Sequence, residues 1–383
     1  MATKIFYSPQ TNLLGAGCIK EVGVQIAALG LKKALVVTDK VLVKHGIAGK
    51  VTEQLTGNGI GFVIYDEVTP NPTCAQVNKG LEILQKNGCD CLVSVGGGSP
   101  QDAASAIGIL ATNGGDIRDY EGVHKATKPG LPTIAVNTTA GTSAELTINY
   151  VITDEERGVK MVMVDKNSIA RISVSDPELM LDKPADLTAA TGMDMLTHAI
   201  ECLLTQGAYP VSDCMALECV KIVFKYLPTA VKDGSNIEAR EQMTYANFLV
   251  GLAFSNAGLG FVHSMAHQLG GIYDLPHGVC NAMLLPIVTK ANAPYAPEKI
   301  RTIAKALDMN VCGAGDTACA DYVIRKIEEL SQCVGIPKKL SELGIENPDL
   351  DRLAENALKD ICAGGNPFAP TKEQTIAMFK ELL

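Results

Sequence analysis

The chain has 383 residues, of which 47% are hydrophobic and 20% charged, and this composition excludes a generally disordered protein. The formal net charge of -9 comes without a basic stripe, which argues against a nucleic-acid partner and favours a small-molecule substrate. A chain of 383 residues exceeds what one hydrophobic core normally supports, so we expect two domains.

The N-terminus and the cysteines bear on the location of the protein. Met1 to Gln10 lacks the apolar core of a signal peptide, and the 12 cysteines show no C-x-x-C or zinc-ribbon spacing. We therefore expect reduced thiols and a cytoplasmic location. The longest apolar run, Phe248 to Val262, is short and glycine-rich, so we predict no membrane segment.

The first half of the chain alternates between helix-like and strand-like segments. This alternation predicts an α/β domain, in which a parallel sheet is covered by helices on both faces. The expected helices and strands, in chain order, are a helix over 15–29, a strand over 34–38, a helix over 47–55, a strand over 61–65, a helix over 75–86, a strand over 91–95, a helix over 103–110 and a strand over 132–136.

A glycine-rich turn follows the strand over 91–95. Its sequence is G-G-G-S-P-Q-D over 96–102, and an apolar helix comes next. Glycines let a ligand approach the backbone closely, and the N–H groups at the start of a helix favour an anion such as pyrophosphate. A glycine-rich turn alone is weak evidence, because tight turns commonly use glycine, but the preceding strand and the following helix strengthen it.

Two further segments lie at predicted strand ends. The hydroxyl-rich segment 137–143 either lines the same crevice, at the carboxyl ends of the strands, or is a solvated loop. Asp39 also ends a strand, where a carboxylate accepts from ribose hydroxyls and repels a 2′-phosphate, which favours NAD over NADP.

The pattern changes near Pro184, where we place the domain boundary. From there to Leu383 the periodicity is helical, and we expect no strand. We also expect helix breaks at the prolines of this half, which are Pro210, Pro228, Pro286, Pro294 and Pro337.

Histidines and one carboxylate cluster in the helical half. Asp194 and His198 are four residues apart, as are His263 and His267, and His277 follows. That spacing puts each pair on one face of a helix. A single such histidine is usually an ordinary hydrogen-bonded residue, but together these groups suit a divalent metal such as Fe²⁺ or Zn²⁺.

Four motifs carry a resemblance to a known family. They are G-G-G-S-x-x-D over 96–102, N-T-T-A-G-T over 137–142, A-T-G-M-D over 190–194 with His198, and G-x-x-H-x-x-x-H over 260–267 with P-H-G over 276–278. Together they resemble the iron-containing, or group III, alcohol dehydrogenases, nearest the branch of NAD-dependent methanol dehydrogenases, 1,3-propanediol dehydrogenases and lactaldehyde reductases. The resemblance covers essentially the whole chain.

The resemblance implies a Rossmann-like parallel-sheet domain over 1–183, which binds NAD, and an all-α domain over 184–383, which binds metal and substrate, an architecture like that of dehydroquinate synthases. It implies His267 as a nearby histidine outside the ligand set, and Phe254 beside the substrate pocket. Because His267 lies one turn beyond His263, we expect it to pass the released proton toward solvent. The implied ligands of the metal (Fe²⁺ first, with Zn²⁺, Mg²⁺ and Mn²⁺ open) are Asp194, His198, His263 and His277. The implied NAD site consists of Asp39, Asn71, Gly96, Gly97, Gly98, Ser99, Asp102, Thr138, Thr139, Thr147, Lys160 and Leu179.

The sequence departs from the family pattern at Ser105, where relatives commonly carry lysine, and at Ser143, where they carry glycine. The expected reaction is hydride transfer between a short primary alcohol or diol and NAD. A non-redox metal-dependent lyase of the dehydroquinate synthase type, and a catalytically silent homologue, are the alternatives. The resemblance also implies a homo-oligomer.

Overall fold

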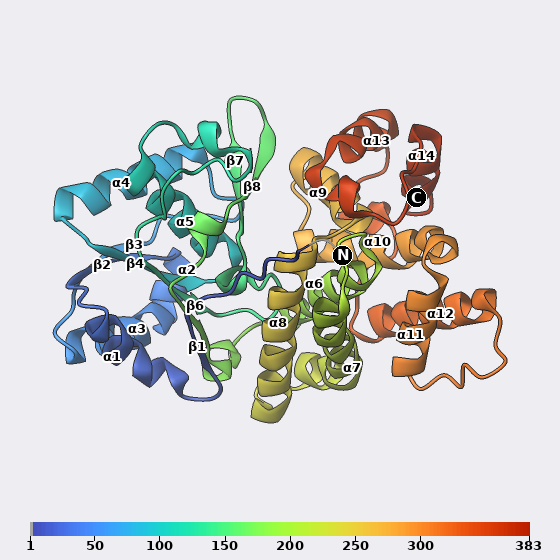
Figure 1. The fold of residues 1–383 in the computed structure, drawn as a ribbon, viewed down its shortest axis with the longest axis horizontal. Helices are drawn as coiled ribbons and strands as arrows, with labels where there is room; N and C mark the ends of the chain where they lie inside the picture. The colour runs from blue at the N-terminus through green and yellow to red at the C-terminus, as the bar shows by residue number, and fades with distance from the viewer. Residues whose placement is uncertain (1–2) are drawn as a thin grey trace. The chain divides into compact units, whose positions relative to one another are not determined.

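The computed structural model describes residues 3–383. The chain divides into two compact units, Met1–Asp182 and Lys183–Leu383. Figure 1 follows it from the strands and helices of the first unit, in blue to green, to the helices of the second, in yellow-green to red. The expected combination of an α/β part and an all-helical part is confirmed.

A parallel sheet forms the centre of the first unit. Its strands are β1 (Thr11–Leu14), β2 (Lys33–Val37), β3 (Gly61–Tyr65), β4 (Cys91–Gly96), β6 (Thr133–Asn137) and β9 (Ile172–Ser175). The order is β1-β9-β6-β4-β2-β3, and all neighbours are parallel. Every residue of β4, β6 and β9 is buried, as expected of parallel strands covered on both faces.

Helices cover both faces of this sheet (Figure 1). They are α1 (Val22–Ala28), α2 (Lys40–Lys44), α3 (Ile47–Gly57), α4 (Cys74–Asn87) and α5 (Gly98–Asn113). On one face α1 and α3 pack with Val36 and Val93, and on the other α4 and α5 pack with Leu35 and Leu92. Successive strand residues thus enter opposite cores, as the period of two requires.

The strand order reverses beside β2. β3 lies on one side of β2, whereas β4 lies on the other side, and β6 and β9 continue outward from β4. In open α/β sheets, ligands bind outside the carboxyl ends of the strands at such a reversal. The register places Gly96 beside Asn137, and Asn137 beside Ser175, at this edge. The glycine-rich turn therefore lies at the reversal.

Several elements of the first unit differ from expectation. The predicted helix over 15–29 begins late, with a 3-10 turn over Cys18–Glu21 before α1, because Gly15 and Gly17 adopt left-handed φ angles of 109° and 77°. Strands β1 and β9 were not predicted. Neither was a three-stranded sheet of β5 (Gly122–Val123), β8 (Val159–Val164) and β7 (Asn149–Asp154).

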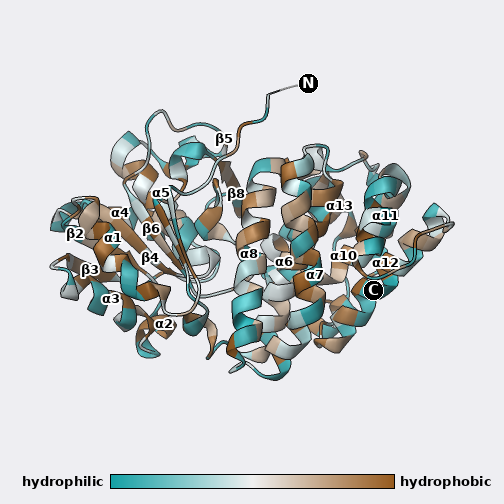
Figure 2. Cartoon of the chain, turned by 60° about the horizontal axis from the view of Figure 1, so that its bottom comes forward, coloured by the Kyte–Doolittle hydropathy of each residue, from teal (hydrophilic) through white to brown (hydrophobic). Residues whose placement is uncertain are grey.

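The second unit is helical throughout, within the residues described. Its central helix, α6, packs against α7, α8 and α10 and is buried around most of its surface. Figure 2 shows hydrophobic and hydrophilic residues mixed along these helices. The helices are α6 (Ala185–Leu204), α7 (Pro210–Lys232), α8 (Ile237–Ala257), α9 (Phe261–Tyr273), α10 (His277–Asn292), α11 (Pro297–Ala306), α12 (Asp316–Cys333), α13 (Leu350–Lys359) and α14 (Lys372–Lys380).

Two of the expected helix breaks are wrong. Pro228 lies inside α7 and Pro286 inside α10. An interior proline costs about 3 kcal/mol in an isolated helix. Burial of neighbours such as Val223 and Leu227 against the other helices of the unit outweighs that cost.

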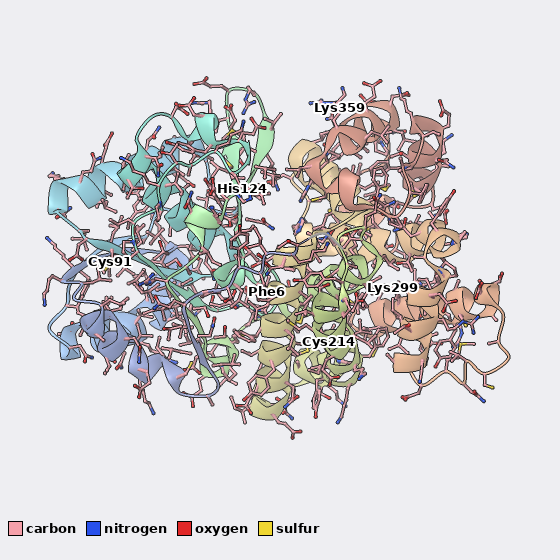
Figure 3. The ribbon with its side chains drawn as sticks, in the orientation of Figure 1. Phe6, Cys91, His124, Cys214, Lys299 and Lys359 are labelled. Carbon is pink, nitrogen blue, oxygen red and sulfur yellow. The ribbon has the colours of Figure 1, made fainter. Side chains whose placement is uncertain are left out.

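The thiols of the described chain are reduced. None of the 12 cysteines, all of which fall within residues 3–383, is joined in a disulfide, and Cys91 in β4 and Cys214 on α7 are labelled in Figure 3. No single helix of the described chain is long and apolar enough to cross a membrane. Helices α8 and α9 together have the length and apolar composition of a membrane-spanning segment, but the chain bends by 101° between them.

Candidate metal centre and cofactor site

Two of the expected metal ligands lie on α6. Asp194 and His198 are four residues apart, so both project from one face of the helix. Their exposed fractions are 2% and 4%. Polar groups buried to this degree require partners in the interior.

The other two expected ligands lie in the first turns of α9 and α10. His263 is the third residue of α9, and His277 is the first residue of α10. Gly278 allows the start of α10 to approach α6 closely, because a Cβ atom there would lie 2.4 Å from the carbonyl oxygen of Ala190. The Pro-His-Gly motif therefore brings His277 toward Asp194.

Donor atoms of three expected ligands converge. One such atom from each of Asp194, His263 and His277 lies within 4.8 Å of the others, and Oδ1 of Asp194 is 3.6 Å from Nε2 of His277. Nδ2 of Asn281 lies 2.6 Å from Asp194 Oδ1, 3.0 Å from His277 Nε2 and 3.2 Å from His263 Nε2. An amide has only two N–H groups, which face three potential acceptors here. Three donor atoms of this kind so close together would suit a bound cation.

The electrostatics favour the forms of these groups that bind metals. Burial raises the pKa of Asp194, but His198, His277, His263 and the Asn281 amide outweigh it and lower that pKa overall. Burial, with His198, holds the pKa of His263 well below its usual 6.5. Metals bind ionised carboxylates and neutral imidazoles. The donor set therefore fits a divalent cation such as Fe²⁺ or Zn²⁺.

His198 and Phe254 lie beside this three-residue set. The ring of His198 stacks on that of His263, with centroids 4.6 Å apart, and on that of Phe254, with centroids 4.3 Å apart and planes 9° from parallel. Phe254 comes from α8 and is 4% exposed. All four expected ligands and Phe254 thus form one cluster, in which three ligands already have the spacing of a metal site.

His267 lies one turn after His263 on α9. Its ring centroid is 5.5 Å from that of His277, and its Nδ1 is 2.8 Å from Oδ2 of Asp360. Burial raises the pKa of Asp360, but His267 outweighs it and lowers that pKa overall. Cys362 completes a second group of donor atoms within 4.8 Å, and its backbone N–H donates to Oδ1 of Asp360 at 2.9 Å. Hydrogen bonding accounts for this second group without an ion.

Sequence reasoning missed three polar residues of the cluster. Asn281 follows His277 by four residues and Glu201 follows Asp194 by seven, so helical spacing was a usable signal for both. Burial raises the pKa of Glu201 to about 7. Asp360 is 93 residues from His267, and no local pattern connects the two.

In the first unit, backbone geometry defines the glycine-rich turn. Gly96 has a φ of +152°, and a Cβ atom there would lie 2.5 Å from Cγ of Pro100. A Cβ at Gly97 would lie 3.1 Å from the side chain of Thr139. Gly97 precedes α5 and supplies no side-chain cap, so the first N–H groups of that helix are available to an anion.

Other predicted cofactor residues gather around this turn or pair with one another. The N–H of Thr138 donates to the carbonyl of Gly96 at 3.1 Å, and Ser99 is the second residue of α5. Nζ of Lys160 donates to Oδ1 of Asn71 at 2.8 Å. Desolvation raises the pKa of Asp102 to about 8, against the opposing charge of Lys160.

Some predicted cofactor residues have local structural roles. Asp39 caps α2 by accepting from the N–H of Leu42 at 2.9 Å, and Oγ1 of Thr147 donates to the carbonyl of Asn149 at 3.1 Å. Leu179 is 5% exposed and belongs to the core that contains Val95. These contacts leave the cofactor assignment of the three residues as a prediction.

Comparison with known proteins identifies the family. Residues 9–177 match the family described as "Iron-containing alcohol dehydrogenase", and residues 188–383 match "Fe-containing alcohol dehydrogenase family, C-terminal". The chain is 47% identical to "Alcohol dehydrogenase 4" of Schizosaccharomyces pombe, over 100% of this chain and 90% of that protein. It is 43% identical to the "NAD-dependent methanol dehydrogenase" of Bacillus methanolicus, over 99% of each.

A solved structure agrees with these sequence relatives. The structure entitled "Crystal structure analysis of 1,3-propanediol oxidoreductase" matches with a TM-score of 0.98 and 44% identity, over 100% of both chains. Both family matches together span nearly the entire chain, and the motifs that carried the resemblance lie within them. The chain therefore belongs to the iron-containing alcohol dehydrogenase family.

Proposed function

We propose that this protein is a metal-dependent oxidoreductase that transfers hydride between a short primary alcohol or diol and NAD, and reduces the aldehyde in reverse. The observation that carries the proposal is the set of Asp194, His263 and His277 donors within 4.8 Å, of which Asp194 and His263 are buried. Relatives named as methanol and 1,3-propanediol dehydrogenases support the substrate class. The non-redox lyase is not favoured, because these relatives are dehydrogenases.

The second unit supplies the groups that act on the substrate. Asp194, His198, His263 and His277 would hold a divalent cation, whose Lewis acidity lowers the pKa of a substrate hydroxyl. Asp360 accepts from Nδ1–H of His267, so Nε2 of His267 carries the lone pair that receives a proton. His267 is 14% exposed and relays that proton toward solvent. Phe254 provides an apolar wall beside His198.

The first unit supplies the groups that hold NAD, the hydride acceptor. Gly96, Gly97, Gly98 and Ser99 offer backbone N–H groups to the pyrophosphate at the start of α5, with Asp102, Thr138, Thr139 and Thr147 around them. Asn71 and Lys160 act as a pair, and Leu179 supports the site from the core. The carboxylate of Asp39 disfavours a 2′-phosphate, so an Asp39→Gly variant relaxes the preference for NAD over NADP.

Three further expectations belong to this proposal. The cofactor binds the domain over 1–183, while the metal and the substrate bind the domain over 184–383. The protein assembles as a homo-oligomer and works in the cytoplasm. A mass measurement in solution tests the assembly, and a clean monomer contradicts it.

An anaerobic assay of nicotinamide absorbance tests the reaction. The protein is stripped of metal, reloaded with Fe²⁺, Zn²⁺, Mg²⁺ or Mn²⁺, and supplied with methanol, propanol, 1,2-propanediol or 1,3-propanediol. We expect metal-dependent NADH formation, and none from the stripped protein. Silence with every metal, despite demonstrated metal binding, contradicts the proposal and revives the lyase and the silent homologue.

A further inference from the structure

Glu201 is a buried carboxylate on the same face of α6 as two of the expected ligands. It follows His198 by three residues and Asp194 by seven, and it is 2% exposed. Leaving a charged group at such a position without partners would cost several kcal/mol.

Both oxygens of Glu201 bind the first turn of α9. Oε1 accepts from the backbone N–H of Val262 at 2.6 Å, and Oε2 lies 2.5 Å from Nδ1 of His263. The residue before α9 is Gly260, which has no side chain to cap the helix. A Cβ atom at Gly260 would lie 3.0 Å from Oε1 of Glu201, so glycine permits this approach.

The two ring nitrogens of His263 have partners of opposite kinds. In its ionised form the Glu201 carboxylate only accepts hydrogen bonds, so Nδ1 then carries the hydrogen that faces it. The Glu201 contact therefore selects the tautomer with Nδ1 protonated and Nε2 directed toward Asp194 and His277. A lone pair on Nε2 is compatible with the Asn281 amide, whose Nδ2 lies 3.2 Å away and whose two N–H groups face three acceptors.

We propose that Glu201 is a positioning residue, which fixes the tautomer and orientation of His263 so that Nε2 binds the metal. This inference rests on the metal centre of the proposed function. A carboxylate that accepts from the far nitrogen of a metal-bound histidine also raises the basicity of the ligand. Glu201 itself touches neither substrate nor cofactor in this role.

The variant Glu201→Gln separates the positioning role from helix capping. The amide oxygen of glutamine still accepts from the N–H of Val262, whereas its NH₂ group donates to His263. Nδ1 then becomes the acceptor, the hydrogen moves to Nε2, and the lone pair facing the metal is lost. A residue that only caps α9 would tolerate this exchange.

The matched control is Asp360→Asn. It makes the same carboxylate-to-amide exchange at Nδ1 of His267, the other histidine of α9. Because His267 is not an expected ligand, this variant should bind metal as wild type does. Any general effect of removing a buried carboxylate beside α9 would appear in both variants.

The experiment uses Co²⁺ as the probe and two readouts. Titration of the metal-free full chain, followed by visible absorbance, should give a dissociation constant 10- to 100-fold higher for Glu201→Gln than for wild type or Asp360→Asn. Nitrogen-15 NMR of histidine-labelled, metal-free wild type should show His263 protonated at Nδ1, a readout that needs no variant.

The outcomes separate this inference from the proposed function. Equal Co²⁺ affinity in wild type and Glu201→Gln, or a wild-type His263 protonated at Nε2, overturns the role of Glu201 while the metal centre stands. If wild type binds no Co²⁺, the metal centre fails and the inference falls with it. Weaker binding only in Glu201→Gln, with the expected tautomer in wild type, supports the inference.

Discussion

In the second unit the candidate site consists of side chains, whereas in the first it consists largely of backbone. Asp194, His263 and His277 come from three helices, and the donor atoms that converge belong to their side chains. The turn at Gly96 and Gly97 instead offers backbone N–H groups at the edge of a sheet. Removing a side chain should therefore disrupt the site in the second unit, whereas adding a side chain to a glycine should disrupt the site in the first.

The pKa of a carboxyl group is also shifted in opposite directions in the two units. Asp194 has its pKa lowered by three histidines and an amide, despite burial. Asp102 has its pKa raised to about 8 by desolvation, which the charge of Lys160 only partly opposes. The site expected to bind a cation thus maintains a negative charge, whereas the site expected to receive pyrophosphate keeps a carboxyl group neutral near pH 7.

The largest expected effect follows from removing a side chain in the second unit. His263→Ala deletes a donor atom at the centre of the cluster, so we expect loss of bound metal and a fall in turnover of more than about a hundredfold, beyond the effect of residues that only support a ligand. Metal analysis and the NADH assay measure this. His45→Ala, an exposed histidine of the first unit, is the control. Full metal content in His263→Ala would show that it is not a ligand.

The next effect comes from adding one carbon in the first unit. Gly96→Ala places a Cβ 2.5 Å from Pro100 at a φ of +152°, so we expect about 1–3 kcal/mol of destabilisation and a higher KM for NAD. Urea unfolding and kinetics measure the two effects. Gly49→Ala is the control, because a Cβ there meets nothing within 4 Å and adds helix propensity in α3. Equal free energies of unfolding for Gly96→Ala and Gly49→Ala would show that the turn at Gly96 does not depend on the absence of a Cβ atom.

Much of the fold follows from local patterns. β3 has the predicted bounds, and the i, i+4 spacing paired Asp194 with His198 and His263 with His267 in the sequence; the donor atoms of Asp194, His263 and His277 converge in the structure. Strand β1 was not predicted because it has four residues, half of them exposed, at the edge of the sheet. The helix break predicted at Pro228 was wrong because tertiary packing overrides local propensity.

Partners from distant parts of the chain could not be predicted. Asp360 meets His267 across 93 residues, and Glu201 meets His263 across 62. Such pairs depend on how helices pack, and periodicity within one helix carries no information about the facing helix. Which side chains support the histidines therefore had to come from the structure.

A smaller effect tests the contrast between the two carboxylates. Because the pKa of Asp102 is about 8 in the fold and near 3.8 when unfolded, the unfolded state releases its proton first as pH rises. The free energy of unfolding of wild type should therefore fall, relative to Asp102→Asn, between about pH 4 and pH 8, by roughly 1 kcal/mol in total for this partly exposed group. Urea midpoints across this range measure it. Parallel curves would mean that Asp102 is ionised throughout.

The smallest effect concerns Ser143, where the family resemblance leads us to expect glycine. Ser143 is fully buried with a φ of 52°, a left-handed conformation that costs a residue with a Cβ about 1–2 kcal/mol. Glycine removes that cost but loses about 0.5–1 kcal/mol more chain entropy on folding. We therefore expect Ser143→Gly to raise the free energy of unfolding by about 0.5 kcal/mol, measured by urea unfolding. Ser143→Ala retains the Cβ and should give no gain. If Ser143→Ala stabilises the protein as much as Ser143→Gly, the buried hydroxyl group, and not the left-handed backbone, destabilises the fold at this position. The effect would then depend on a side chain, as in the site of the second unit, and not on the backbone.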